Sequence, residues 1–476
     1  MALRAGKHSW QVMPVRQTRP RIALRAMYQV VCAILACALS TTAIQAQDLS
    51  VPDDAGRQLV RLAADQDWAK AEALARKILA IRPGDVSALV VLARARRAAG
   101  DAAGAREAAL RADANARTDE EHYVAAIEIA AASYDLGKPM IAQLWLRRAT
   151  QMAPSDALRT RTLRNLQAVA AATPWSLEGQ FSVAPSSNVN HGSLADTIDI
   201  GGLPFTLNPD AKALAGVEIN LGLRARYRFR GLMDLPAEAS FAAFTQQIAL
   251  SASAQNKAPD AAGSDYAYDI VEFALGQALT DASAPVRYRV DGALGKAWYG
   301  GAELSQYARA AAHAQWGDAR RAVNTVTLQA ERQARQDDPH RSATILNLGL
   351  RRDWRLASGD ALAMALRAQH TQSNSVEIDN DALIGSLSYD FGTVLGGRLS
   401  LGSALEIEHR RYDASVYSND TRRDWRHRLA VTVGFPKSGY YGFTPQVQLQ
   451  IEKVDSTVDF YDQSDATLLF GLKSVF

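Results

Sequence analysis

Apolar and polar residues follow two different patterns along this chain, and the change falls at Trp175. From about residue 55 to residue 172 the sequence is rich in alanine, leucine and arginine, which favour helices. From Trp175 onward apolar and polar residues alternate, as in a strand with one apolar face and one wet face. The first such stretch places Leu177, Phe181 and Val183 on its apolar face. The pattern therefore predicts a helical region followed by a region of strands.

A repeat runs through the helical region with a period of about 34–37 residues, which is typical of tetratricopeptide repeats. Ala71, Ala105 and Ala142 take equivalent places, and Pro83 and Pro154 stand where a helix must stop. Small residues at fixed places allow paired helices to pack closely. The repeat predicts a tetratricopeptide-like solenoid over residues 55–172; an alanine-rich bundle with accidental periodicity is the alternative. Such solenoids bind peptides or protein segments, so we expect a docking arm.

The alternating region contains fourteen segments long enough to cross a membrane as tilted strands, each of which needs about 9–11 residues. An even number suits a closed single-chain barrel. The fold class predicted is thus α + β multidomain, with an N-terminal helical solenoid and a C-terminal antiparallel transmembrane β-barrel over residues 175–476. The segments are 175–184, 213–230, 238–254, 266–278, 285–299, 304–316, 321–334, 342–356, 359–373, 378–391, 396–412, 422–435, 442–455 and 464–476.

The polar face of these segments carries charges and amides, which a dry core could not bury cheaply. A wet lumen could hold them, and the apolar face would then meet lipid. One segment carries a ladder of arginines that we expect to line this lumen and to contact a client or an anion: Arg224, Arg226, Arg228 and Arg230. The tryptophans of the region fall at predicted strand ends, where an aromatic girdle would lie; they are Trp175, Trp298, Trp316, Trp354 and Trp425.

The start of the chain has the pattern of a secretory signal peptide over residues 1–46. Arginines and a lysine precede an apolar run from Val30 to Leu39, and small residues follow. Residues 47–54 are expected to form a short linker. Both cysteines, Cys32 and Cys37, lie in the apolar run, so a mature chain would contain no thiol. A lipoprotein signal ending at Cys37 is a less favoured alternative.

The sequence offers no catalytic, cofactor-binding or metal-binding pattern, and we expect no enzyme. It has no phosphate-binding loop, dinucleotide fingerprint or nucleophile elbow, and its histidines are isolated. The formal net charge of +3 argues against a nucleic-acid binder.

The first strand and the last strand carry the most specific residues of the chain. Pro185 is expected to end the first strand, because proline cannot donate to a ladder. The short polar residues that follow are expected to fix a turn, and a contact with a client is the sharper hypothesis for Pro185, Ser186, Ser187, Asn188 and Asn190. The chain closes on alternating apolar residues and an aromatic end, and we interpret Phe470, Gly471, Leu472 and Phe476 as a barrel-assembly signal.

These features together resemble the surface lipoprotein assembly modulator (modifier) family of Gram-negative bacteria. The resemblance rests on the stretch from Trp175 to Asn190 and on the closing strand, and on architecture in the helical part. It implies a periplasmic helical domain that engages clients and an outer-membrane barrel that delivers lipoproteins or related secreted proteins to the cell surface. The expected partners are a client protein, outer-membrane lipid and, during biogenesis, the barrel-assembly machinery. No enzymatic residue or cofactor follows from the resemblance.

Two other functions fit the same architecture. Polysaccharide-export porins also join repeat solenoids to barrels, although usually with more repeats and a lumen of one charge sign. A passive outer-membrane porin is the third alternative.

Overall fold

The computed structural model describes residues 54–200, 203–418, 421–439 and 443–474. The chain divides into two compact units, which meet between Ala172 and Thr173 and are described separately below. The expected signal peptide lies outside the described residues, as does all of the expected linker except Asp54. Asp54 is the first residue of helix α2.

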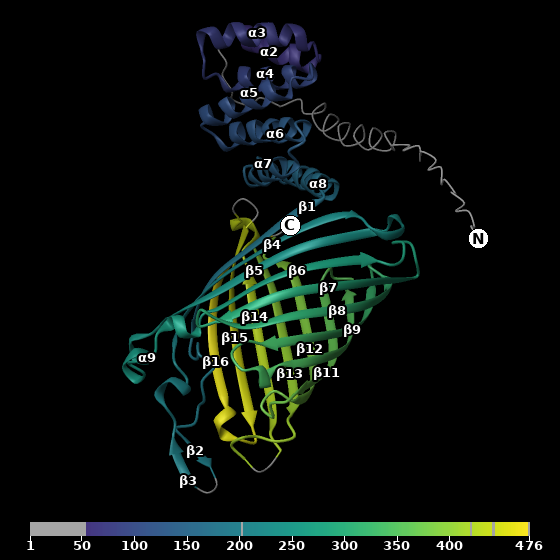
Figure 1. Cartoon of the computed structure of the whole chain (residues 1–476). Helices are drawn as coiled ribbons and strands as arrows, with labels where there is room; N and C mark the ends of the chain where they lie inside the picture. The colour runs from purple at the N-terminus through teal and green to yellow at the C-terminus, as the bar shows by residue number, and fades with distance from the viewer. Residues whose placement is uncertain (1–53, 201–202, 419–420, 440–442, 475–476) are drawn as a thin grey trace, which may run out of the picture. The chain divides into compact units, whose positions relative to one another are not determined.

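The first unit contains antiparallel helices joined by short turns (Figure 1). α4 packs against α2 and α6 as well as against its sequence neighbours α3 and α5, as expected when helix pairs stack into a solenoid. The helices are α2 (Asp54–Ala64), α3 (Trp68–Ile81), α4 (Val86–Ala98), α5 (Ala102–Asn115), α6 (Asp119–Asp135), α7 (Pro139–Gln151) and α8 (Asp156–Ala172). No helix in the described part of the chain is long and apolar enough to cross a membrane.

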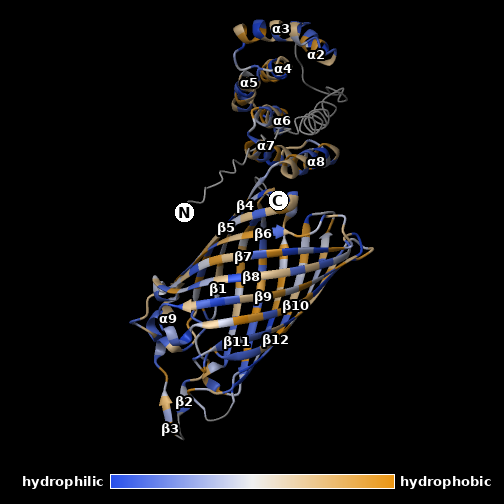
Figure 2. Cartoon of the chain, turned by 45° about the vertical axis from the view of Figure 1, so that its right-hand side comes forward, coloured by the Kyte–Doolittle hydropathy of each residue, from blue (hydrophilic) through white to orange (hydrophobic). Residues whose placement is uncertain are grey.

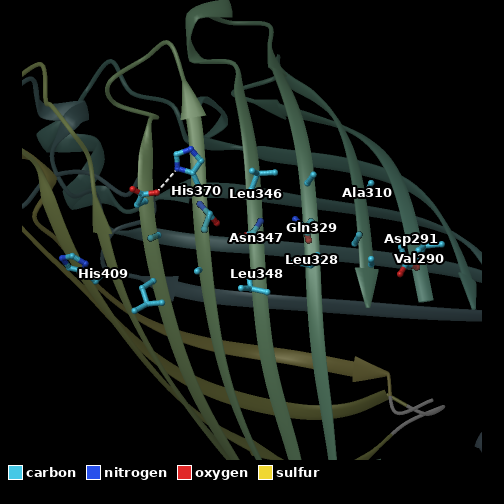
Figure 3. A pocket seen from close by; sticks show the side chains of 18 of the residues that line it. Val290, Asp291, Ala310, Leu328, Gln329, Leu346, Asn347, Leu348, His370 and His409 are labelled. Carbon is cyan, nitrogen blue, oxygen red and sulfur yellow. Dashed lines mark hydrogen bonds and ion pairs between the residues drawn. The ribbon is translucent and has the colours of Figure 1, made fainter. Parts of the chain in front are cut away.

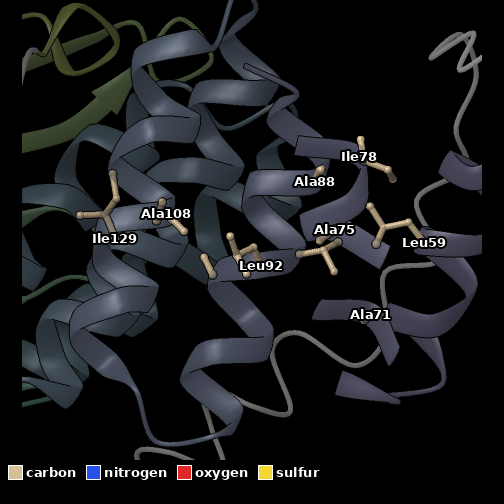
Figure 4. Close-up of a cluster of buried hydrophobic side chains, with 11 residues drawn as sticks. Leu59, Ala71, Ala75, Ile78, Ala88, Leu92, Ala108 and Ile129 are labelled. Carbon is tan, nitrogen blue, oxygen red and sulfur yellow. The ribbon is translucent and has the colours of Figure 1, made fainter. Parts of the chain in front are cut away.

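Small residues at the repeated places form the core of this unit. Ala71, Ala105 and Ala142 are all at most 1% exposed, which allows close approach of neighbouring helices. One cluster joins Leu59, Leu92 and Ile129 from alternate helices (Figure 4). Three helix starts are also fixed locally: the Asp67, Asp85 and Asp101 side chains cap α3, α4 and α5. The tetratricopeptide-like solenoid predicted from the sequence is therefore confirmed.

The second unit is a closed antiparallel barrel of fourteen strands (Figure 1). Each strand pairs with its sequence neighbour in the barrel, and β1 closes the ring against β16. The barrel strands are β1 (Trp175–Ser186), β4 (Gly216–Arg230), β5 (Pro236–Leu250), β6 (Tyr268–Ala278), β7 (Val286–Tyr299), β8 (Ala302–Asp318), β9 (Ala322–Arg335), β10 (Ala343–Arg355), β11 (Ala361–Ser373), β12 (Asn380–Val394), β13 (Leu399–Arg411), β14 (Arg423–Gly434), β15 (Phe443–Ser456) and β16 (Gln463–Ser474). Each predicted segment corresponds to one of them.

Apolar and polar residues alternate along the strands as the sequence predicts, and the colours of Figure 2 follow this alternation. The large apolar side chains share the exposed outer face, and the residues between them face the lumen. Leu221, Leu348 and Leu449 are each about half exposed on the outer face, at 54%, 45% and 45%. Such a band is stable only against lipid, and a closed barrel leaves no unpaired strand edge in the bilayer. The five tryptophans of the barrel lie within three residues of a strand end, as predicted.

Two connections between strands contain elements that the alternating pattern does not predict. A small hairpin forms from β2 (Thr197–Ile200) and β3 (Leu203–Thr206). Between β5 and β6 the short helix α9 (Ala252–Lys257) packs Ala254 against Leu214.

We call the end of the barrel where β1 begins the entry end, and the end where β1 stops the exit end.

Candidate functional site

The lumen wall is lined by ion pairs between strands rather than by charge of one sign. Near the middle of the wall Arg309 of β8 contacts Glu272 of β6 and lies 3.5 Å from Glu331 of β9. The Tyr307 hydroxyl donates to the same Glu272 at 2.6 Å. Both carboxylates of this group are therefore already occupied by partners within the wall.

A second group of inward charges joins β13, β14 and β15. Arg428 lies 2.7 Å from Glu452 and 3.2 Å from Glu406, and Arg426 lies 3.5 Å from Glu408. Pairing of this kind stabilises inward charges that only water would otherwise solvate. The wall as a whole is polar but close to neutral, which differs from the single-sign wall expected for export of a charged polysaccharide.

The four predicted arginines of β4 do not act as one ladder. Arg226 pairs with Glu178 of β1. Arg228 donates to the Thr173 carbonyl at 2.9 Å, and Arg230 donates to the Asp234 carbonyl at 2.7 Å. Arg224 is exposed and has no ion pair with any residue that the structure describes. Of the four, only Arg224 offers an uncommitted charge to a ligand.

The polar residues after β1 converge on one carboxylate, that of Asp465 in the last strand. Its Oδ1 accepts hydrogen bonds from Ser186 Oγ at 2.8 Å, from Ser187 N and Oγ at 3.1 Å, and from Asn188 N at 3.0 Å. These four donors come from consecutive residues. The exit turn of β1 is thus bound to the start of β16, where the barrel closes.

Two asparagines continue this arrangement into the following loop. Asn188 is only 1% exposed and exchanges hydrogen bonds with the Gly192 backbone at 2.8 and 3.0 Å. The Asn190 amide donates to the Lys212 carbonyl at 2.8 Å and accepts from Leu214 N at 2.9 Å. A side chain at Gly192 would place its Cβ 2.3 Å from the Lys212 carbonyl oxygen, so glycine is required there. The structure therefore gives these polar residues a role in holding the loop, and contact with a client stays a hypothesis.

The expectation that Pro185 ends the first strand is wrong. β1 continues to Ser186, and Pro185 is in register with Val217 of β4. Pro185 instead interrupts the pairing of β1 with β16. Ser187 donates its N–H to Ala466 of β16, so the nitrogen of Pro185, two residues earlier, faces β16 as well but has no hydrogen to donate. The pairing of β1 with β16 runs over Gln180–Val183, stops at Ala184 and Pro185, and resumes at Ser186.

The residues of the expected assembly signal lie where the seam between β1 and β16 closes. Phe470 and Leu472 face outward and are 48% and 41% exposed, as lipid-facing side chains are. Gly471 is in register with Ser182 of β1. Phe476 lies outside the described residues.

The loops at the exit end are tied together around Glu377. This carboxylate accepts from Val416 N at 2.8 Å, from Arg422 at 3.2 Å and from the Tyr461 hydroxyl. Burial, together with the hydrogen bond to Glu377, raises the pKa of Tyr461, which stays a neutral donor at physiological pH. The connections after β11, β13 and β15 are thereby held to one another.

The outer wall carries a hollow of about 980 Å³ between β7 and β13 (Figure 3). Alanines such as Ala310 line it together with Leu328, Leu346 and Leu348. At its upper edge in Figure 3, the His370 ring lies 2.8 Å from Asp381. The hollow faces the bilayer, where lipid chains would fill it.

No family model matches this chain, and no curated protein matches it. Among solved structures, the chain is similar to Pseudomonas putida OprB at 10% identity, over 66% of this chain and 95% of that chain, with a TM-score of 0.35. It is similar to a bacterial polysaccharide outer membrane secretin at 11% identity, over 63% and 98%, with a TM-score of 0.31. It is also similar to the Yersinia enterocolitica type III secretion translocator chaperone SycD at 15% identity, over 25% and 82%, with a TM-score of 0.23. Matches at this level of similarity carry no functional argument.

The class of the protein follows from its own geometry. The closed barrel, its apolar outer face and its polar lumen define a membrane-spanning β-barrel of the outer-membrane type. The stacked helix pairs define a tetratricopeptide-like unit on the same chain.

Proposed function

We propose that this protein is an outer-membrane export or assembly factor that delivers surface lipoproteins or related secreted proteins across or onto the outer membrane. The observation that carries the proposal is the covalent joining of a repeat unit of the protein-binding type to a closed barrel, since β1 begins at Trp175, three residues after α8 ends at Ala172. The helical unit, in the periplasm, binds the client, and the barrel delivers it. The resemblance to the surface lipoprotein assembly modulator family supports this function.

Ion pairs join α4 to α6 within the helical unit. Arg94 of α4 lies 2.7 Å from Glu128 of α6, and Arg97 lies 3.7 Å from Asp135 on the same pair of helices. Burial raises the pKa of Asp135 despite the nearby Arg97. Because Glu128 is only 1% exposed, these charges hold the stacked helices to one another.

The paired charges of the lumen are a second support for a protein client. A wall with both signs, each largely neutralised, does not select a polyanion along its whole length. A passive porin would have no need of a docking unit.

The test is deletion of residues 55–172 with the barrel retained, in cells that co-express a tagged candidate lipoprotein. We expect display of the tag on intact cells, measured by antibody labelling, to be lost, while the heat-dependent gel shift of the folded barrel is kept. Display that persists in the deletion variant would contradict the docking role. Loss of an extracellular glycan in a knockout, with display intact, would favour polysaccharide export, and steady conductance that is indifferent to the deletion would favour a porin.

A further inference from the structure

A pocket of about 400 Å³ opens into the lumen across the seam that closes the barrel. It is lined by residues of β1, β4, β5, β6, β8 and β16, so it exists in full only when the last strand has joined the first. Its volume lies in the range of small-ligand and peptide-side-chain sites, about 300–1,000 Å³. This pocket, which we call the seam pocket, combines two features.

The first feature is its free positive charge. The seam pocket contains two carboxylates and two cations. Glu178 is taken by Arg226, and Glu272 is taken by Tyr307 and Arg309. The cations, Arg224 and Lys473, have no ion-pair partner in the part of the chain that the structure describes. The charge left for a ligand is therefore positive, although the surrounding wall is close to neutral.

The two cations are placed so that one ligand could reach both. Lys473 is in register with Gln180 of β1, which is in register with Gly222 of β4, two residues before Arg224. Neighbouring strands lie about 4.8 Å apart, so the backbones at Lys473 and Gly222 are about 10 Å apart. Both side chains are long and flexible enough to converge on one carboxylate or on two neighbouring ones.

The second feature is apolar surface inside a polar lumen. Phe244, Ile270 and Ala242 line the seam pocket beside the two cations. Gly222, which lines the pocket, and Gly295, which lies against the lining residue Tyr307, leave room for polar side chains. A Cβ at Gly222 would lie 2.7 Å from the Gln180 side chain, and one at Gly295 would lie 2.2 Å from the Tyr307 ring. The Gln180 and Tyr307 side chains therefore lie directly on the backbone of these glycines. Phe244 and Ile270 stay open to the lumen as a result.

We propose that the seam pocket binds an extended segment of the client in which an apolar side chain stands next to an aspartate or glutamate. The apolar side chain contacts Phe244 and Ile270, and the carboxylate is bound by Arg224 and Lys473. The identity of the ligand as a client segment rests on the proposed function; the pocket and its charge do not. A glycan carboxylate could use the same cations but would gain nothing from the two apolar residues, which is why a peptide is favoured.

The experiment measures binding of short, fluorescently labelled, end-capped peptides to the full chain in detergent micelles, by fluorescence anisotropy. One peptide alternates leucine and aspartate, a second alternates leucine and lysine, and a third alternates serine and aspartate. We expect the leucine–aspartate peptide to bind best. Arg224→Gln and Lys473→Gln should each weaken it about tenfold, as loss of one charge-assisted hydrogen bond does.

Arg367 provides the matched control, because it faces the lumen from β11, lies outside the seam pocket and has no ion pair among the described residues. Arg367→Gln should leave peptide binding unchanged, and all three variants should keep the gel shift of a folded barrel. Equal binding by wild type, Arg224→Gln and Lys473→Gln would overturn the proposal, as would an equal loss in Arg367→Gln. Tighter binding of an acidic oligosaccharide than of the leucine–aspartate peptide, with the same dependence on Arg224 and Lys473, would overturn it in favour of a glycan.

Failure of the site can be told apart from failure of the proposed function. If client display depends on the helical unit but peptide binding is indifferent to both cations, the seam pocket is wrong and the export role stands. If peptide binding follows the two cations but display survives deletion of residues 55–172, the docking role is wrong and the pocket stands.

Discussion

At the scale of single residues, Asp465 is the group on which most local order depends. One of its oxygens accepts four hydrogen bonds from the exit turn of β1, and its neighbours Ser186 and Asn188 are 5% and 1% exposed. A buried donor without an acceptor costs about 1–3 kcal/mol. The Asp465 carboxylate therefore holds the end of β1 to the start of β16, where the barrel closes.

We predict that Asp465→Ala lowers the free energy of unfolding by roughly 2–4 kcal/mol. The serine hydroxyls lose their acceptor, and the buried N–H of Asn188 keeps only Ser186 Oγ, 3.1 Å away. Urea titration of the refolded protein in lipid vesicles measures the change. Asp413→Ala is the control: Asp413 lies at the same end of the barrel, its side chain is 81% exposed and its ion pair with Arg411 is 3.4 Å long. That surface pair should contribute less than about 1 kcal/mol. Equal effects of the two substitutions would contradict the role given to Asp465.

Residue types alone could not have revealed this site. The stretch from Pro185 to Asn190 predicts a polar turn, and a turn is present, but the partner of its serines is 278–279 residues away in the sequence. Lys473 and Glu272 were likewise not singled out, because nothing local distinguishes an inward charge with a partner from one without. Only the register of the closed barrel shows that Arg224 is free while Arg226 is paired.

At the scale of elements, the sequence predicts the barrel strands well, because a period of two sustained over ten or more residues is a strong signal. β2, β3 and α9 were missed for the opposite reason. Thr197–Ile200 and Leu203–Thr206 have only four residues each, and Ala252–Lys257 continues an alternating segment without a break in composition. The glycine pair between β2 and β3 is the signal that could have indicated a hairpin.

The seam between β1 and β16 is the weakest pairing in the ring, since it is short and is interrupted at Ala184 and Pro185. We predict that a disulfide from Ser182→Cys and Gly471→Cys forms readily, because a Cβ built at Gly471 lies 3.5 Å from the Ser182 Cβ. That separation lies within the range of natural disulfides. The oxidised variant should keep its folded gel mobility to a temperature roughly 5 °C or more above that of the reduced one.

A second cysteine pair tests whether the effect belongs to the seam. Asn347→Cys with Gln369→Cys joins register partners of β10 and β11, which pair without interruption. This pair should raise the transition temperature less. An equal or larger rise would show that the seam is not the first part of the barrel to open.

At the scale of the whole molecule, the surrounding lipid decides which substitutions are tolerated. Leu348 lies near the middle of β10 and faces outward, while its neighbour Asn347 faces the lumen. We predict that Leu348→Arg lowers the stability of the folded barrel in lipid vesicles by about 2–4 kcal/mol, as a charge at the bilayer midplane does. Asn347→Arg should change it little. Urea titration of both variants measures the difference, and similar losses would show that the two faces had been assigned wrongly.

The seam also determines when this protein can first become a barrel. β1 is the first barrel strand of the chain and needs β16, and the Asp465 carboxylate arrives only with that final strand. A contact of such long sequence separation forms late and slowly. Until then the edge of β1 that pairs with β16 is open to wrong partners. The serines after Pro185 can therefore form their hydrogen bonds only once the last strand is in place. A protein truncated before Asp465 should remain an open sheet that proteases degrade.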